Sequence, residues 1–435
     1  MTSLAARLVG PYLLLLATAW PSIALLGHRA TIADLLFAII AWLFALDLSR
    51  GRVAVRWRPA WLALLAYLAA MLLSALASSA PALALPKLAT QAYLLAIPLV
   101  LAHLIEDERA LASAVRWWLA GSAALALLAL LGLAAFLIAP QGDLYRSLAF
   151  YQGSLPPSDY PRFKFNFANG NMAANYAGAS LLVALLAGWL GWIPRRLARL
   201  LAGAMIGVAL LAVSPGLGAI AFALGWWGWL TFRRRWTRGA SLAAGSVLTL
   251  TMLAATATTL VARAGQSPLL SLADGTAVWP SIRLTIWRAA IERIRDAPWL
   301  GHGIGADPVA VPWITPSGDP QTLTDAHNLY LSITAQCGLV GLAAFVAVLM
   351  LASSRLRRRL SDVPLSAAAI VLAGGFVIGM AIDGLTGSFE DSRHLWALLG
   401  LMLAATQSRR TRAVQTCSPS TSAAIGRPER SVAGR

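Results

Sequence analysis

A histidine near the end of a long polar stretch has the residue type and the setting for acid–base chemistry. The stretch runs from Arg263 to Leu331. Thr324 and Asp325 are helix-capping residue types, so His327 is predicted in the first turn of the apolar helix that follows. A helix N-terminus disfavours the imidazolium, and neutral histidine is the usual general base near neutral pH. A capping or interfacial histidine is the simpler alternative, and position alone favours it.

The same stretch contains an arginine-rich amphipathic segment, residues 281–297. Four apolar residues recur there at helical spacing, and charged residues occupy another face. The apolar set is Leu284, Trp287, Ile291 and Ile294, and the charged set is Arg288, Glu292 and Arg295. Ser281 signals the start of this helix and Pro298 its end. The helix either anchors the chain to a membrane surface or uses its guanidinium groups to bind phosphate oxygens.

Basic and amide side chains also gather ahead of an earlier apolar run. Arg162 and Lys164 alternate with aromatic residues, which favours extended backbone. Asn169, Asn171 and Asn175 follow where the next helix is predicted to start. Capping explains one of these asparagines, and contact with a sugar or a phosphate is the alternative for the others.

Several other chemistries lack a motif in this sequence. No outer loop has Asp-x-Asp, no His/Cys cluster has metal-ligand spacing, and no phosphate-binding P-loop occurs. The carboxylates Asp383, Glu390 and Asp391 face outward but are scattered. We therefore predict that any group transfer is metal-independent, uses no cofactor, and relies on acid–base and electrostatic catalysis.

Composition predicts an all-α polytopic membrane protein. The chain has 435 residues, of which 58% are hydrophobic and 12% charged, against about 25% charged in soluble domains. Apolar runs indicate about twelve transmembrane helices. They cover residues 8–26, 31–48, 59–77, 86–104, 112–138, 172–193, 199–213, 215–232, 239–262, 328–352, 363–384 and 393–407.

The basic residues predict the orientation of these spans. The formal net charge is +17, and most of it sits in arginine clusters between spans. The clusters lie at residues 50–58, 195–199, 233–238, 355–359 and 409–412. All of them fall on one side, which the positive-inside rule makes cytoplasmic, so nucleic acid is not needed to explain the charge. Both termini are then cytoplasmic, and residues 408–435 form a disordered tail.

Two long loops are then predicted outside, at residues 139–171 and 263–327, and the second is expected to be a large helical loop. Both contain positive charge that the orientation rule does not explain. The residues are Arg146, Arg162, Lys164, Arg263, Arg283, Arg288, Arg293 and Arg295. Contact with an anionic ligand and contact with lipid headgroups are both open explanations for each of them.

Four motifs together resemble the O-antigen ligase/polymerase superfamily of bacterial membrane glycosyltransferases. The segment Arg283-Leu-Thr-Ile-Trp287-Arg-Ala-Ala is similar to the family's Arg-x3-Trp helix, and Pro298-Trp-Leu-Gly301-His-Gly303 to its glycine turn. His327-Asn328-x-x-Leu331 resembles the signature His-Asn-x-x-Leu. Phe167-Ala-Asn-Gly-Asn171 resembles the first-loop asparagine motif. One departure is Ser214-Pro215-Gly216, where relatives often have Ser-Arg-Gly.

The resemblance implies a GT-C-type fold and an undecaprenyl-diphosphate-linked glycan donor. On the matching positions, His327 is the implied general base, and Arg283 and Arg288 are the implied diphosphate ligands. Arg162, Lys164 or Arg263 replaces the arginine missing at position 215, and Asn171 and Asn328 are further implied substrate contacts. The inner membrane is the implied location, with the active site on the periplasmic side.

Loop layout favours an O-antigen ligase within the superfamily. Such an enzyme transfers the polysaccharide to a sugar hydroxyl of lipid A–core. An O-antigen polymerase and a protein O-oligosaccharyltransferase are the alternatives in the same superfamily. A transporter of the same lipid-linked glycan is the alternative from another class, and it would favour inverted repeats, which the sequence does not show.

Overall fold

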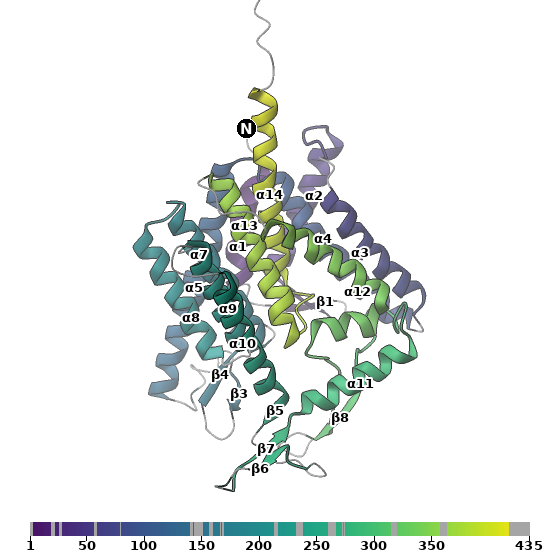
Figure 1. Ribbon diagram of the computed structural model, residues 1–435. Coiled ribbons are helices and arrows are strands. Elements are labelled where there is room, and N and C mark those ends of the chain that lie inside the picture. Colours follow the sequence, from purple (N-terminus) through teal and green to yellow (C-terminus); the bar gives the residue numbers. More distant parts are fainter. Residues whose placement is uncertain are drawn as a thin grey trace, which may run out of the picture.

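The structure is a computed structural model, and it shows a bundle of helices with most of the short strands at its lower end (Figure 1). It describes residues 3–18, 22–25, 28–55, 59–78, 80–139, 142, 151–155, 160–165, 167, 169–212, 216–231, 238–259, 267–271, 273, 275–314, 320–356 and 363–416. The bundle helices are α1 (Leu4–Thr18), α2 (Ile32–Ser49), α3 (Pro59–Leu76), α4 (Pro81–Leu104), α5 (Glu108–Ile138), α7 (Gly170–Trp189), α8 (Arg195–Ala212), α9 (Leu217–Thr231), α10 (Arg238–Ala257), α12 (Leu329–Leu356), α13 (Pro364–Val377) and α14 (Arg393–Thr416).

Each predicted span contains one of these helices. Within the described residues, 7 helical segments are long and apolar enough to cross a membrane. The chain is therefore a mostly helical, multi-pass membrane protein, as its composition predicts. The number of crossings and the GT-C-type fold stay predictions.

The first predicted span, residues 8–26, needs a correction. Helix α1 ends at Thr18, and the hairpin of β1 (Ser22–Leu25) and β2 (His28–Thr31) follows it. The Thr31 side chain and Asp34 form a capping box, which fixes the start of α2 at Ile32. The end of the predicted span is therefore strand rather than helix.

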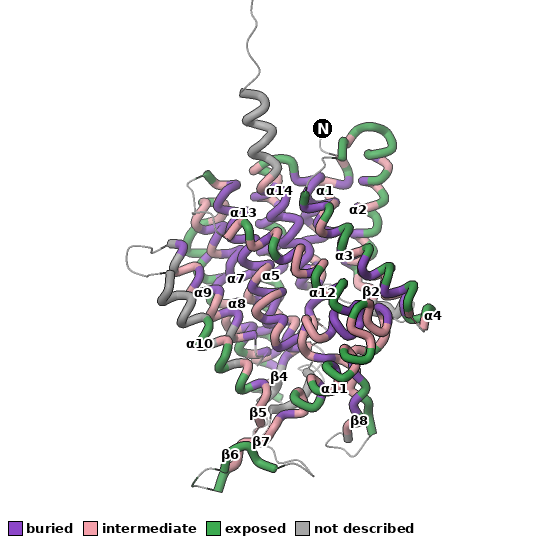
Figure 2. Tube along the Cα trace, turned by 45° about the vertical axis from the view of Figure 1, so that its right-hand side comes forward, coloured by how far each residue is buried: buried purple, intermediate pink, exposed green. Residues whose placement is uncertain are grey.

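The centre of the bundle is formed by the helices that are most completely buried. The most apolar window of α7 is 78% buried and that of residues 364–385 is 83% buried, against 28% for α2. Buried residues accordingly fill the middle of the bundle in Figure 2, and exposed ones lie on its outside. Outer helices expose apolar side chains such as Leu130 and Leu137 of α5, as expected where lipid is the solvent.

The second outer loop was predicted to be helical, and the structure corrects this. It contains α11 (Ile282–Asp296), but also strands. The strands are β5 (Thr258–Thr259), β6 (Leu270–Ser271) and β7 (Ala277–Pro280), in the order β5-β7-β6, and the hairpin of β8 (Val311–Ile314) and β9 (Pro320–Leu323). Short runs rich in Val, Trp and Ile that are interrupted by Gly, Pro and Asp favour such strands over helix. The first outer loop has a hairpin too, of β3 (Tyr151–Leu155) and β4 (Tyr160–Phe163).

Helix α11 has nearly the predicted bounds but buries a different face. Ile286 and Ala290 are fully buried against Val309 and Val311. Leu284 and Ile291, assigned to the apolar face from the sequence, are 37% and 42% exposed. The β8–β9 hairpin is the reason, because it covers the side of α11 that periodicity alone does not single out.

The end of α11 is joined to a kink in α12. Gly338 has φ 65°, which interrupts the helix, and a Cβ atom there would collide with the Trp299 carbonyl. Backbone N–H groups of residues 339 and 340 donate to the carbonyls of residues 298 and 299, at 2.8 and 3.2 Å. Those of residues 302 and 303 donate to the carbonyls of residues 335 and 336, both at 3.1 Å. Residues 298–303 and residues 335–340 are therefore joined directly by backbone hydrogen bonds.

The end of α13 departs from α-helical geometry. It continues as a π-helical turn, η1 (Ile378–Ile382), and a 3-10 turn, η2 (Asp383–Leu385). Segment 385–391 then leads to α14. Helix α14 runs to Thr416, so the predicted disordered tail begins inside a helix, and residues 417–435 lie outside the described residues. Irregular turns of this kind often occur at functional sites.

Candidate functional site

His327 lies just before α12 rather than in its first turn, which corrects the sequence-based placement. Asn328 is the residue that caps the helix: its Oδ1 accepts from the Leu331 N–H at 3.0 Å. The Asn328 amide also donates to the Leu385 carbonyl at 3.1 Å. His327 itself has φ 48°, a left-handed backbone conformation that cannot continue a helix.

Asp325 contacts His327 at two points. Its Oδ1 accepts the His327 backbone N–H at 2.8 Å, and its Oδ2 lies 3.2 Å from His327 Nδ1. The Ser388 hydroxyl donates to the same Oδ1 at 2.7 Å. The side chains of His327 and Asp325 are 32% and 44% exposed, so the pair is accessible to a substrate.

Helix α11 supports this group from one side. The Ser281 side chain caps it by accepting the Arg283 N–H at 3.1 Å. Arg283 donates from Nη1 to the Thr386 carbonyl at 2.8 Å, and the Trp287 indole donates to the Ala326 carbonyl at 3.2 Å. Arg283 and Trp287 are four residues apart and so share a face. That face reaches both the residue before His327 and segment 385–391.

Arg288 lies on another side of the same helix. It is five residues after Arg283, which corresponds to about 140° around an α-helix. Its side chain is exposed, as are Leu284, Ile291 and Arg295. These residues form an outward stripe at spacing i, i+4, i+7 and i+11. The structure therefore brings Arg283 to segment 385–391, which also contacts Asp325, and places Arg288 on another side of α11.

The candidates from the first outer loop are placed unevenly. Asn169 caps α7, accepting the Met172 N–H at 2.9 Å, and Asn171 is buried in the first turn. Lys164 is half-buried. Arg162 lies in β4, but its side chain is outside the described residues, and so is the whole of Arg263.

Asn175 belongs to a buried polar group in the middle of the bundle. Its amide donates to Asp383 Oδ2 at 2.8 Å, and its Oδ1 lies 2.7 Å from His394 Nε2. This pairing explains Asn175 without a sugar or a phosphate. Gly216 lies beside Asp383, since a Cβ atom there would come within 3.2 Å of the carboxylate. The neighbouring position, 215, is where relatives often have an arginine.

The carboxylates that look scattered in the sequence converge on segment 385–391 and its neighbours. Glu390 accepts the Ser332 hydroxyl at 2.6 Å, and Asp391 pairs with Lys87 and accepts from Gln91. Burial raises the pKa of Glu390 from its ordinary value of 4.5 to about 7, and the negative charge of Asp391 adds to the effect. The sequence signal for this segment is the high density of polar residues between the apolar runs 363–384 and 393–407, and the sequence-based predictions did not include it.

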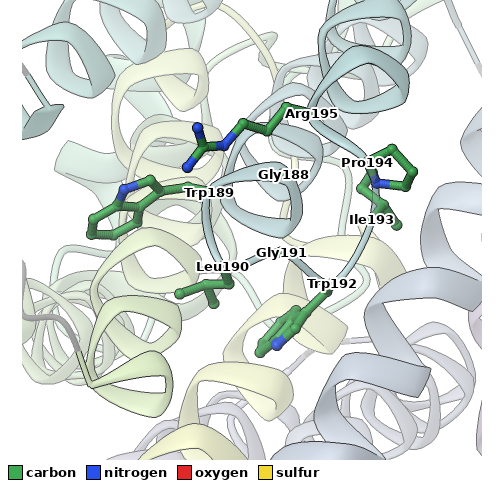
Figure 3. Close-up of a pocket in the computed structure, with 8 residues that line it drawn as sticks. All are labelled: Gly188, Trp189, Leu190, Gly191, Trp192, Ile193, Pro194 and Arg195. Carbon is green, nitrogen blue, oxygen red and sulfur yellow. The ribbon is translucent and has the colours of Figure 1, made fainter.

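A separate hollow lies in another part of the described structure. It has a volume of about 510 Å³ and surrounds the turn between α7 and α8 (Figure 3). Its lining consists of residues 188–195, including Trp189, Trp192 and Arg195. Arg195 is the one ionisable group in this lining, so the hollow holds no acid–base pair. Within the described residues, His, Cys, Asp and Glu side chains also form no group of three suited to a metal ion.

Comparisons with known proteins agree with the motif-based resemblance. Residues 214–346 match a family model described as O-antigen ligase. This region contains α11, His327 and the start of α12. A protein of Pseudomonas aeruginosa named O-antigen ligase is 36% identical over 72 residues, and the match covers 17% of this chain and 17% of that protein.

Proposed function

We propose that this chain, whose residues 214–346 match a family model described as O-antigen ligase, is a membrane glycosyltransferase that acts as an O-antigen ligase. It would transfer O-antigen polysaccharide from undecaprenyl diphosphate to a sugar hydroxyl of lipid A–core. The observation that carries the proposal is the arrangement of His327 and Arg283 around segment 385–391. A base just before α12 and a fixed cation on α11 are the two groups that transfer from a lipid diphosphate requires.

The proposed reaction is a displacement at the anomeric carbon of the donor. The acceptor oxygen forms a bond to that carbon as the bond from carbon to the diphosphate oxygen breaks. The bonding electron pair leaves with the diphosphate, and the acceptor's proton passes to His327. His327 is thus the general base, and the reaction needs no cofactor.

Arg283 is the proposed ligand for the diphosphate. A guanidinium has five N–H donors, so its contact with the Thr386 carbonyl is compatible with phosphate binding. That contact orients the side chain beside the loop that also supports His327. Its positive charge then stabilises the charge that develops on the leaving diphosphate.

Arg288 is the second diphosphate ligand implied by the family resemblance. Its place requires the diphosphate to contact the first two turns of α11, which contain both Arg283 and Arg288, and not the last turn of that helix. Arg162, Lys164, Arg263 and Asn171 are proposed contacts farther along the glycan. Asn328 caps α12 and binds Leu385, so we assign it to holding the site together.

The proposed location is the bacterial inner membrane, with His327 and α11 on the periplasmic side. The N-terminus and the end of α14 lie at the upper end of the bundle in Figure 1, and α11 and the strands of the outer loops lie at the lower end. The arginine clusters of the sequence support a cytoplasmic position for the upper end.

The test is a gel-shift assay in a bacterial strain that lacks its own ligase. Wild type, His327→Ala and Arg283→Ala are expressed at equal membrane levels, with Arg295→Ala as a control on the exposed side of α11. We expect wild type and Arg295→Ala to restore long glycan on lipid A–core, and the other two variants to lose it. If wild type alters only the length of lipid-linked glycan, the chain is a polymerase. Glycan that crosses the membrane without being joined to anything would indicate a transporter.

A further inference from the structure

We propose that Asp325 is the positioning residue for His327, and that Ser388 holds Asp325 in place. The inference rests on the proposed function, because it concerns the base of that reaction. It adds two residues to the site that neither the sequence motifs nor the comparisons assign. Both residues act through His327 and not on the substrate.

The first step is the geometry of the carboxylate. Oδ1 accepts two hydrogen bonds, from the His327 N–H at 2.8 Å and from the Ser388 hydroxyl at 2.7 Å. Those two donors fix the plane of the carboxylate and direct Oδ2 to the ring, where it lies 3.2 Å from Nδ1. One side chain thus holds both the backbone and the imidazole of the same residue.

The second step is the backbone of His327. A left-handed conformation is uncommon for residues other than glycine, although histidine adopts it more readily than most, and it persists where surrounding contacts hold it. Here the enforcing contact is the Asp325 carboxylate on the His327 N–H. In this conformation the imidazole ring of His327 lies beside the same carboxylate that accepts its backbone N–H. The strained backbone and the ring contact are therefore parts of one arrangement.

The third step is the proton chemistry. A carboxylate beside Nδ1 favours the tautomer in which Nδ1 carries the proton, so Nε2 is the nitrogen with a lone pair. The acceptor hydroxyl gives its proton to Nε2 as its oxygen attacks the anomeric carbon. The resulting imidazolium is then stabilised by the Asp325 carboxylate beside Nδ1.

Two of the other histidines, His302 and His394, contact neutral oxygens where His327 contacts a carboxylate. His302 Nε2 lies 2.9 Å from the Arg293 carbonyl, and His394 Nε2 lies 2.7 Å from the Asn175 amide oxygen. Neutral oxygens orient a ring but give little stabilisation to an imidazolium. His327 has a carboxylate in that place, together with an exposed ring.

Segment 385–391 connects the base to the cation. Ser388 holds Asp325, and the carbonyl of Thr386, two residues earlier, accepts from Arg283. The same short segment therefore sets the position of the proton acceptor and of the proposed diphosphate ligand. Its attachment to η2 and α14 at either end fixes it to the bundle.

The test measures kcat and KM of purified full-length protein in nanodiscs, with lipid-linked glycan as donor and lipid A–core as acceptor. The variants are Asp325→Asn and Ser388→Ala, and Asp307→Asn is the matched control, an exposed aspartate in the same loop. We expect kcat of Asp325→Asn to fall about 10²-fold at unchanged KM. Ser388→Ala should lose about three- to tenfold in kcat. Asp307→Asn should match wild type.

A double variant separates positioning from simple loss of structure. If Asp325 acts through His327, adding Asp325→Asn to His327→Ala should cause no further loss of kcat. An unchanged kcat for Asp325→Asn would overturn the inference while the ligase function stands, and so would a rise in KM alone. A further loss in the double variant would also count against it. If wild type and Asp307→Asn are both inactive in ligation, the proposed function itself fails.

Discussion

Two residues other than glycine adopt a left-handed backbone in the described part of the chain, and they are held in different ways. Phe165, in the first outer loop, has φ 52°, and His327, in the second, has φ 48°. Phe165 is fully buried and stacks on Phe163 with ring centroids 5.6 Å apart. The His327 ring is partly exposed and is held by polar contacts to Asp325.

The difference indicates that the strained backbone has a structural role at Phe165 and a role in the proposed chemistry at His327. A backbone of this kind is unfavourable by about 1–3 kcal/mol, and something nearby must offset it. At Phe165 the burial of an aromatic ring does so, and any well-packed ring would serve. At His327 the offset comes from hydrogen bonds that also set the position and charge of an imidazole. The first residue should therefore matter for stability and the second for activity.

The sharpest test of this distinction is His327→Gly. Glycine adopts the left-handed conformation without strain, so the free energy of unfolding should stay the same or rise by up to about 1 kcal/mol. Ligation should fall by at least about 10²-fold, because the base is lost. Thermal unfolding in detergent and the gel-shift assay measure the two quantities. A variant that is both inactive and markedly less stable would give His327 a structural role instead.

The converse expectation is for Phe165→Ala. Loss of a fully buried ring should lower the free energy of unfolding by about 3–5 kcal/mol. Activity per folded molecule should be retained, since Phe165 has no contact with the His327 group among the interactions described above. Thermal unfolding followed by an activity assay on the remaining folded fraction tests this. Phe165→Leu, which keeps part of the buried surface, is the milder control.

Glu390 offers a test between these extremes, because it is a buried ionisable group close to α12. The folded protein keeps the carboxyl proton up to about pH 7, whereas the unfolded chain loses it above about pH 4.5. Stability should therefore fall as pH rises through that window, by up to about 3 kcal/mol, and remain lower above it. Glu390→Gln cannot ionise and should be less sensitive to pH. Melting temperatures at pH 5, 6 and 7.5, chosen as roughly even steps across the window, compare the two proteins.

The smallest expected effect is that of Arg283→Lys. Lysine keeps the charge but not the planar fork that contacts the Thr386 carbonyl. We expect ligation to fall about tenfold, with little change in stability. Arg295→Lys, on the exposed side of α11, should match wild type. Equal losses in the two variants would mean that the contact of Arg283 with the Thr386 carbonyl has no special part in the reaction.

The sequence was a good guide to elements whose signal is local. Each predicted span contains a helix, and the predicted segment 281–297 corresponds to α11 with Ser281 as its cap. Apolar runs and capping residues are read within a few neighbouring positions, so no distant contact is needed. The buried face of α11 was assigned incorrectly because the β8–β9 hairpin, which covers it, comes later in the chain.

The surroundings of His327 were less accessible to prediction. Thr324, Asp325 and Asn328 can all cap a helix, and only the fold decides that Asn328 does so. Ser388 is 63 positions from Asp325, and Thr386 is 103 positions from Arg283. No periodicity connects residues so far apart. The motif thus identifies the histidine but not the residues that orient it.

The segment that follows α11 is held against the kink of α12 at Gly338, and this contact fixes the position of the site relative to α12. Backbone hydrogen bonds join the two segments, and the absence of a side chain at Gly338 lets them touch. These hydrogen bonds leave little freedom for residues 298–303 to move along α12, so this part of the loop is held rigidly to that helix. If the chain is the ligase proposed above, a lipid-anchored acceptor must then present its hydroxyl at one fixed distance from the membrane. Acceptors would be selected by the distance from their anchor to the reacting sugar, as well as by the identity of that sugar.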